Sequence, residues 1–211
     1  YFPDLPTNPT NPTDPRATKA IYPKDSILED WMQYARRYAE SADCYLIGAI
    51  LPVAGAKIGR NCWYDLDRRK YPNLYSMLAG SPGDRKTTAI DLVEKFANRT
   101  LQSDQLTPSS VSAESLFNIY ETNPNQILID DDANGILTRW KEAGYGKMVS
   151  KAYLRLYDCG AMKESFLRNK KGNDGAAEKR LIPETSTSIL FGCTFNIARF
   201  QQLEDRDGMR R

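Results

Sequence analysis

The chain has 211 residues, of which 41% are hydrophobic and 27% charged, a composition typical of a globular protein that can bury a sizeable core. Its 29 lysines and arginines against 27 acidic residues give a formal charge of +2. This balance excludes a histone-like polycation, so any polyanionic partner must be held by local basic patches. The sequence contains no histidine, which excludes histidine-based acid–base catalysis and histidine metal sites.

The four cysteines are too far apart in the sequence to form a CxxC pair, which argues against a zinc knuckle. Free thiols fit a reducing cytoplasm. The longest apolar run, Tyr45–Ala56, contains a proline and is shorter than the roughly 20 residues that a membrane-spanning helix needs. We therefore expect a cytoplasmic protein without a membrane segment, and a chain that forms part of a longer protein.

Residues 1–21 are predicted to form an extended, proline-rich linker. Five prolines occur at a strict period of three, which places them on one edge of a polyproline II helix. Such a segment favours a semi-rigid spacer to an upstream domain. The alternative is a PxxP-type ligand for an aromatic groove. The prolines are Pro3, Pro6, Pro9, Pro12 and Pro15.

Residues 22–70 are predicted to form an N-terminal helical segment. Ser26 and Glu29 have the spacing of a capping box, in which the serine oxygen accepts a hydrogen bond from the first turn and the glutamate reaches back. We expect a helix from Ile27 to about Ala42. A second, apolar helix is expected from Cys44 to near Leu51, ending at the proline that follows.

Residues 71–211 are predicted to form an α/β core, truncated at its C-terminus. Strands that alternate with helices indicate a mainly parallel sheet flanked by helices. We expect strands at Tyr71–Ala79, Pro108–Ser112 (with a turn), Gln126–Ile129 and Thr187–Cys193. The expected helices are Lys86–Arg99, Ala113–Glu121, Gly135–Glu142 and Lys147–Asp158. A β-hairpin is expected at Glu164–Pro183.

A glycine-rich loop between the first of these strands and its helix predicts a phosphate site. The segment Gly80-Ser81-Pro82-Gly83-Asp84-Arg85-Lys86-Thr87, followed by Thr88, nearly matches the P-loop pattern GxxxxGK[ST]. Its glycines permit a tight turn in which backbone N–H groups converge on a polyphosphate. In that pattern the lysine bridges the β- and γ-phosphates and the threonine hydroxyl coordinates Mg²⁺. The departure is Arg85, which stands where the pattern has glycine.

Three carboxylates follow the strand predicted at Gln126–Ile129. Because the strand ends abruptly in Asp130, Asp131 and Asp132, it is typical of a buried parallel strand that delivers acid to Mg²⁺ at its C-terminal edge. The alternative is a solvated turn. Strand periodicity favours Asp130 as the carboxylate that binds the metal and Asp131 as the group that polarises the attacking water. A shift by one residue, which gives these two roles to Asp131 and Asp132, stays open.

The segments PNLYSMLAGSPGDRKTT, ILIDDDANGIL, YLRLYDCG and SILFGCTFN together resemble the P-loop ATPase domain of primase–helicase-type replication proteins of phages, plasmids and integrated mobile elements. The resemblance covers residues 22–211, and its specific part is the P-loop. It implies a RecA/AAA+-like core, ATP with Mg²⁺, ring-forming homo-oligomers and action on single-stranded DNA. Arginine before the lysine is ordinary in that group, and its acidic motif favours the register of Asp131 and Asp132.

The resemblance also suggests residues that complete an ATPase site. The strand Ser188–Asn196 ends in Thr194 and Asn196, candidates for a polar side chain that senses the γ-phosphate. At the C-terminus, Arg211 or Arg210 corresponds to an arginine finger supplied in trans. The alternatives are a turn-closing polar group and plain solvated charge.

Basic residues near the predicted hairpin are candidates for nucleic-acid contact. They flank a Gly-Asn-Asp-Gly tip, where a basic arm suits tracking a phosphate backbone. Two further patches are interpreted differently. A helical stripe at Lys147, Lys151 and Arg155 is expected to be a solvated helix face, and an aromatic and basic cluster within residues 60–71 is expected to pack its rings in the core. The hairpin residues are Arg168, Lys170, Lys171, Lys179 and Arg180.

Together these patterns predict an ATP-binding and hydrolysing, helicase-like motor domain that acts on single-stranded nucleic acid in the replication of a mobile element. The alternative is a nucleotide-gated DNA-binding or loader module with little turnover, because aspartate stands where hydrolytic P-loop enzymes usually have glutamate. A small-molecule phosphotransferase ranks last, since no arginine-rich lid stands out in the sequence.

Overall fold

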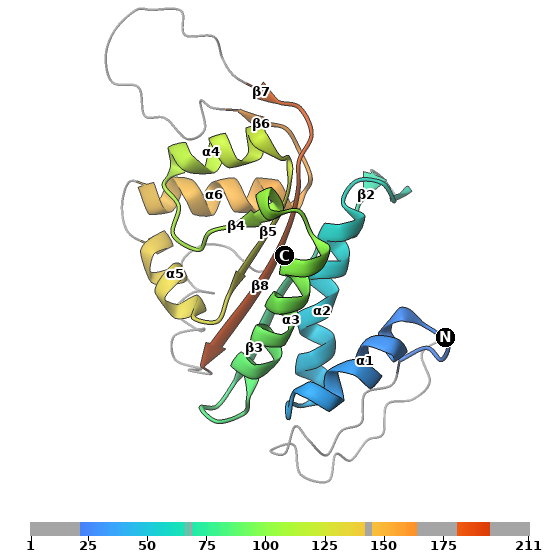
Figure 1. Ribbon diagram of the computed structural model, residues 1–211. Helices are drawn as coiled ribbons and strands as arrows, with labels where there is room; N and C mark the ends of the chain where they lie inside the picture. Colours follow the sequence, from blue (N-terminus) through green and yellow to red (C-terminus); the bar gives the residue numbers. More distant parts are fainter. Residues whose placement is uncertain (1–21, 66, 68, 142–144, 164–180, 195–211) are drawn as a thin grey trace, which may run out of the picture.

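The fold is built around a four-stranded sheet in which every strand pair is parallel, in the order β3-β8-β5-β4 (Figure 1). The computed structural model describes residues 22–65, 67, 69–141, 145–163 and 181–194. Parallel strands need crossover connections, and here helices provide them. The strands are β3 (Tyr75–Gly80), β4 (Leu106–Thr107), β5 (Asn125–Asp130) and β8 (Ser186–Thr194).

Helices cover both faces of this sheet (Figure 1). In β5, Ile127 packs into the core shared with α1, α2 and α3, whereas the next residue, Leu128, packs into the core shared with α4, α5 and α6. Burial on both faces explains the apolar runs Ile127–Ile129 of β5 and Ile189–Phe191 of β8, and it confirms the α/β prediction. The helices are α1 (Ile27–Tyr38), α2 (Asp43–Ile58), α3 (Lys86–Thr100), α4 (Ala113–Thr122), α5 (Ala133–Lys141) and α6 (Tyr145–Tyr157).

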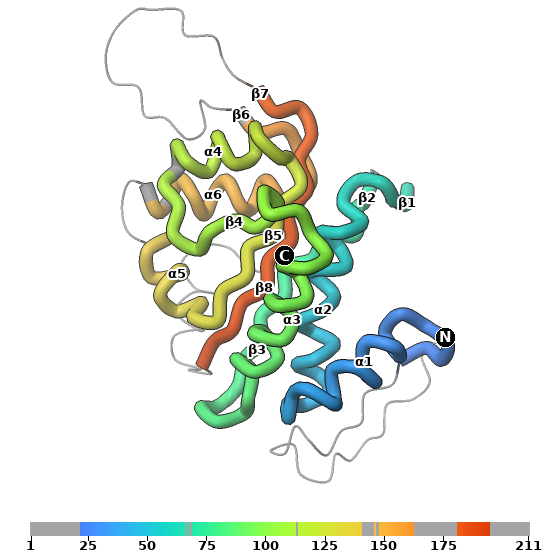
Figure 2. The backbone as a smooth tube through the Cα atoms, viewed as in Figure 1, coloured from blue at the N-terminus to red at the C-terminus, as the bar shows by residue number. Residues whose placement is uncertain are grey.

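Two small antiparallel strand pairs and a 3₁₀ turn, η1 (Ser103–Gln105), lie outside this sheet (Figure 2). The pair β6 (Met162–Lys163) and β7 (Leu181–Ile182) forms the base of the predicted hairpin; residues 164–180 lie outside the described part of the chain. The other pair, β1 (Tyr64–Asp65) with β2 (Arg69–Lys70), was not expected from the sequence. It follows α2 and leads into β3.

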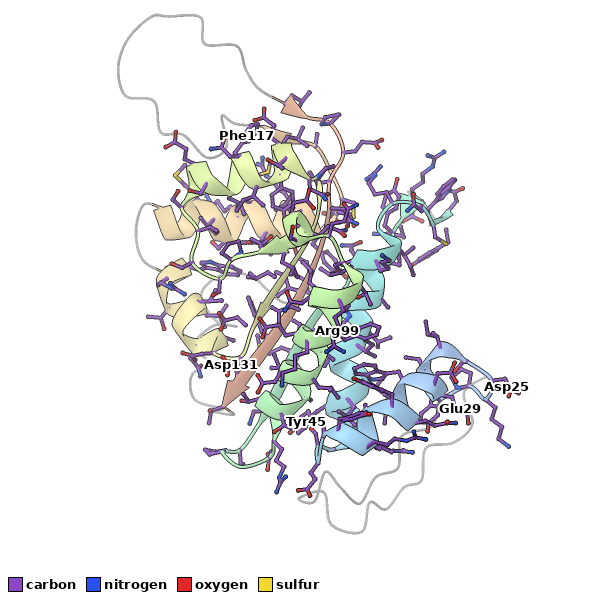
Figure 3. The ribbon with its side chains drawn as sticks, viewed as in Figure 1. Asp25, Glu29, Tyr45, Arg99, Phe117 and Asp131 are labelled. Carbon is purple, nitrogen blue, oxygen red and sulfur yellow. The ribbon has the colours of Figure 1, made fainter. Side chains whose placement is uncertain are left out.

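One of the two bonds of the predicted capping box is present at the start of α1. The Ser26 hydroxyl accepts a hydrogen bond from the Glu29 N–H at 3.3 Å. The Glu29 carboxylate accepts from the backbone N–H of Asp25 at 2.6 Å, one residue earlier than the usual reciprocal bond; both acidic residues are labelled in Figure 3. The two bonds satisfy donors that the helix itself cannot.

Helix α1 ends at Tyr38, so the predicted extension to Ala42 is wrong. Ala39 adopts an extended conformation and caps the helix. The chain then turns toward the glycine-rich loop, where the Ser41 hydroxyl donates to the Arg85 carbonyl at 3.0 Å. A tertiary contact that helix periodicity does not encode therefore sets this boundary.

Helix α2 continues through Pro52 to Ile58, so the prediction that it ends at the proline is wrong. A proline removes the N–H that would bond the carbonyl four residues earlier. In α2 that carbonyl belongs to Gly48, and it accepts a hydrogen bond from the Ser76 hydroxyl of β3 at 2.9 Å. The sheet thus replaces the missing helical bond. Among the described residues, no helix, α2 included, is long and apolar enough to cross a membrane.

Strand β3 begins at Tyr75, four residues later than predicted. Pro72 has no N–H to donate to a sheet ladder, and the Asn73 amide side chain bonds the Tyr157 carbonyl instead at 2.8 Å. The predicted strand at Pro108–Ser112 is also displaced, since the observed strand is β4 at Leu106–Thr107. The other predicted helices and strands of the core are present with boundary shifts of one or two residues.

We predict that Ser76→Ala lowers the free energy of unfolding by about 1–3 kcal/mol, because it leaves the Gly48 carbonyl without its donor. In a Pro52→Ala background the new alanine supplies the missing N–H, so the same serine substitution should cost less. Urea denaturation of the four proteins in this double-mutant cycle measures the difference. An equal cost of Ser76→Ala in both backgrounds would show that the hydroxyl does not compensate for the proline.

Candidate functional site

The glycine-rich loop connects β3 to α3 in a turn that requires its two glycines. A Cβ at Gly80 would lie 2.3 Å from the Tyr45 hydroxyl oxygen and 2.6 Å from Asp84 Oδ2, closer than real side chains allow. Gly83 has a φ of 91°, a conformation that favours glycine. Gly83 therefore has the turn-forming role that the P-loop pattern predicts, whereas Gly80, the last residue of β3, leaves room for the side chains of Tyr45 and Asp84.

Arg85, the departure from the P-loop pattern, has the left-handed conformation that glycine adopts most readily, with φ 58° and ψ 30°. The surrounding contacts hold it there. Its guanidinium pairs with Glu40, and its carbonyl accepts from Ser41 at 3.0 Å. The arginine thus fills the glycine position of the pattern and ties the loop to the segment between α1 and α2.

Lys86, the first residue of α3, turns back over the loop. Its ammonium donates to the carbonyls of Gly80 at 2.9 Å and Ser81 at 2.8 Å, and the residue is only 9% exposed. The Ser81 N–H in turn donates to the Asp84 carboxylate at 2.6 Å. An amide of this loop therefore already holds an anionic oxygen, and a buried cation lies beside it.

The three aspartates at the end of β5 do not share one environment. Asp130 Oδ1 accepts from the N–H of Asp132 at 2.7 Å and so closes the turn into α5. Asp131 and Asp132 line a cavity of about 310 Å³ whose other wall is the glycine-rich loop, while Asp130 is not among the lining residues. Figure 3 shows Asp131 at the end of the sheet where β8 terminates. The cavity is lined by Pro82, Gly83, Arg85, Lys86, Thr87, Asp131, Asp132, Cys193 and Thr194.

Strand β8 lies between the loop strand and the acidic strand, and its polar end belongs to the same cavity. Thr194 is the register partner of Gly80, and its side chain is exposed at the strand end. A Cβ at Gly192 would lie 2.8 Å from the Asp131 carbonyl oxygen, so this glycine permits the close approach of β8 to the acidic turn. Asn196, Arg210 and Arg211 lie outside the described residues, as do all five basic hairpin residues.

Two residues of the site were not predicted from the sequence. Cys193 is buried in the cavity wall; burial raises the pKa of its thiol, and the nearby Lys86 ammonium lowers it. Tyr45 of α2 donates from its hydroxyl to the Ala79 carbonyl at 3.1 Å, and burial and then the Asp84 carboxylate raise its pKa. Strand alternation would place Cys193 and Thr194 on opposite faces, so it does not predict that both line the cavity. Nothing in the sequence of α2 predicts the contact made by Tyr45.

The residues present fit a magnesium–nucleotide complex better than a free metal ion. Among the described residues, no three cysteine or acidic side chains converge into a metal cage. Mg²⁺ usually takes one or two carboxylates, several waters and the phosphates of its substrate. Thr87, Asp131 and Asp132 line one cavity with Lys86, so their side-chain oxygens are the donors that such a complex would use.

Comparison with known proteins identifies no relative of this chain. No protein-family model matches the sequence, and neither a curated protein nor a solved structure matches it.

We predict that Arg85→Gly is more stable than Arg85→Ala by about 1 kcal/mol in the free energy of unfolding, because only glycine is relieved of the left-handed strain. Both substitutions remove the ion pair with Glu40, so their difference isolates the backbone conformation. Chemical denaturation measures it. Equal stability of the two variants would mean that Arg85 does not occupy this conformation.

Proposed function

We propose that the chain is an ATP-binding and hydrolysing motor domain of the P-loop, RecA/AAA+-like type, acting on single-stranded nucleic acid. The observation that carries the proposal is the cavity in which Lys86 and the glycine-rich loop face Asp131 and Asp132. In open α/β sheets, ligands bind at the carboxyl ends of parallel strands, and both walls of this cavity are such ends. Its volume of about 310 Å³ is that of a small ligand site.

The loop has the groups that hold a polyphosphate. The N–H of Ser81 and the amino terminus of the 15-residue helix α3 present donors and a positive helix dipole. Lys86 provides the cation, and its present acceptors are two uncharged carbonyls. A phosphate oxygen is the stronger acceptor, since hydrogen bonds between charged groups are about twice as strong as neutral ones. Binding requires the Asp84 carboxylate to leave the Ser81 amide.

The acidic wall of the cavity supports the assignment in which Asp131 binds the metal and Asp132 orients the water, rather than Asp130 and Asp131. Both line the cavity, whereas Asp130 holds the turn. In this assignment Thr87 and Asp131 hold Mg²⁺, which neutralises charge on the phosphates when it is bound. Asp132 orients the attacking water, and Thr194 contacts the γ-phosphate from the end of β8. Asn196, and Arg211 from a neighbouring subunit of a homo-oligomer, complete the proposed site.

One observation favours the alternative of a nucleotide-gated DNA-binding or loader module. The acids of the cavity are both aspartates, whose side chains are one methylene shorter than the glutamate of most hydrolytic P-loop sites. A misplacement of this size lowers the hydrolysis rate more than it lowers nucleotide affinity. Steady-state phosphate release, measured with and without single-stranded DNA, separates the two functions.

We predict that Lys86→Ala weakens ATP binding at least about tenfold, because it removes the buried cation of the site. Isothermal titration calorimetry measures the affinity. Lys95→Ala, an exposed lysine of the same helix α3, is the matched control and should bind ATP like the wild type. Unchanged affinity in the Lys86 variant would refute the proposed nucleotide site.

We predict that Asp132→Asn retains ATP but slows its hydrolysis about 100-fold, because the substitution keeps the shape of the side chain and removes the charge that orients the attacking water. Asp130→Asn should slow hydrolysis less, since an amide oxygen can still accept the hydrogen bond from the Asp132 N–H. Single-turnover phosphate release compares the two variants. A larger loss of hydrolysis rate in the Asp130 variant would instead favour the assignment in which Asp130 binds the metal and Asp131 polarises the water.

A further inference from the structure

A second cavity, of about 510 Å³, lies at the amino-terminal end of β3, opposite the glycine-rich loop. The last turns of α2, the β1–β2 pair, residues 71–74 and the end of α6 line it. Because the six residues of β3 separate the two cavities, their centres are about 20 Å apart. A substitution in one cavity therefore leaves the residues of the other in place.

Exposed aromatic side chains lie at this second cavity. Tyr64 and Tyr157 line it and are 59% and 50% exposed, and Trp63, which precedes Tyr64 in the chain, is 47% exposed. For Trp63 and Tyr64 these fractions exclude core packing, the role that the sequence alone had favoured for the aromatic rings within residues 60–71. Tyr157 is held edge-on against Tyr75, with ring centroids 4.9 Å apart, so its position is fixed by the core. Large exposed rings around a cavity mark a binding surface more often than a solvated one.

The cavity is also basic. Residues 57–71 contain five lysines and arginines against two aspartates, a net charge of +3 in a chain whose total is +2. Arg69 and Lys70 line the cavity together with one carboxylate, that of Asp158, so its lining has a net positive charge. The Arg69 guanidinium lies over the Trp63 ring, 5.0 Å from its centroid, with Asp65 at 3.8 Å. The Arg69 cation and the Trp63 ring therefore lie together at the β1–β2 pair.

Arg60 forms a rigid floor beneath this surface. It donates to the carbonyl of Cys159 at 2.8 Å and to the hydroxyl of Tyr71 at 2.7 Å, pairs with Glu184 at 3.3 Å and stacks on the Tyr71 ring at 4.1 Å. These bonds connect the residues that follow β2 and α6 with the residue Glu184 before β8. Tyr71, which lines the cavity, is therefore held in place by Arg60.

From this arrangement we propose that the cavity beside the β1–β2 pair binds single-stranded nucleic acid, with bases stacked on Trp63 and Tyr64 and phosphates held by Arg69 and Lys70. Exposed aromatic rings alternating with cations are the two components of sequence-tolerant single-strand binding. The inference deepens the proposed function, on which it rests for the choice of a single-stranded ligand. Binding at this surface needs no ATP.

The test is a titration of a fluorescein-labelled oligothymidylate of about 12 nucleotides, followed by anisotropy without nucleotide. Trp63→Ala should weaken binding at least about fivefold, and Trp63→Phe should bind almost as well as the wild type. Arg69→Ala should also weaken binding, and it should reduce the slope of the logarithm of the binding constant against the logarithm of the salt concentration by about 0.7. Asp65→Asn should tighten binding, because it removes the carboxylate beside Arg69. The controls are Tyr38→Ala and Arg37→Ala, an exposed ring and an exposed arginine on α1.

Three outcomes would overturn the inference: no binding by the wild type, wild-type affinity in both the Trp63→Ala and Arg69→Ala proteins, or equal losses in the α1 controls. Circular dichroism shows whether each variant is folded. ATP affinity, measured on the same proteins, keeps the two proposals apart. Loss of oligonucleotide binding with intact ATP binding supports this inference, while failure of ATP binding alone contradicts only the nucleotide site.

Discussion

The candidate site depends on how closely β8 packs against helix α3 and against the acidic turn that follows β5. Gly192 makes this possible, because a Cβ there would lie 2.7 Å from the Ile90 side chain of α3 and 2.8 Å from the Asp131 carbonyl oxygen. One missing side chain thus lets the helix behind the glycine-rich loop, the central strand and the acidic turn meet. Any larger residue would push the loop and the carboxylates apart, since backbone atoms cannot yield as a flexible side chain can.

The segment before the sheet also belongs to this site. Ser41 and Glu40 hold Arg85 in its left-handed conformation, and the Tyr45 hydroxyl bonds the backbone just before the loop. Helix α2 runs from these contacts to the aromatic cavity at the other end of β3 (Figure 2). The N-terminal helices therefore support the loop directly.

The sequence predicted what periodicity and local chemistry encode. The capping box at Ser26, the order of strands and helices, and the parallel sheet followed from such patterns. It failed where a distant partner decides, because Ser76 of β3 compensates for Pro52 in α2 and so lets the helix continue. The contacts from the α1–α2 connection that hold Arg85 in the left-handed conformation are likewise not encoded locally. Strand alternation favoured Asp130 for the metal; the structure places Asp131 and Asp132 on the cavity instead, and the metal ligand stays a prediction.

The central claim is that a triphosphate lies between the glycine-rich loop and the acidic turn. A crystal structure with Mg²⁺ and a non-hydrolysable ATP analogue tests it most directly. The account predicts phosphates in the cavity lined by Lys86 and Asp131, with the Lys86 ammonium moved from the Gly80 and Ser81 carbonyls to phosphate oxygens. A nucleotide bound elsewhere, or a Lys86 that keeps its carbonyl bonds while the nucleotide is bound, would contradict it.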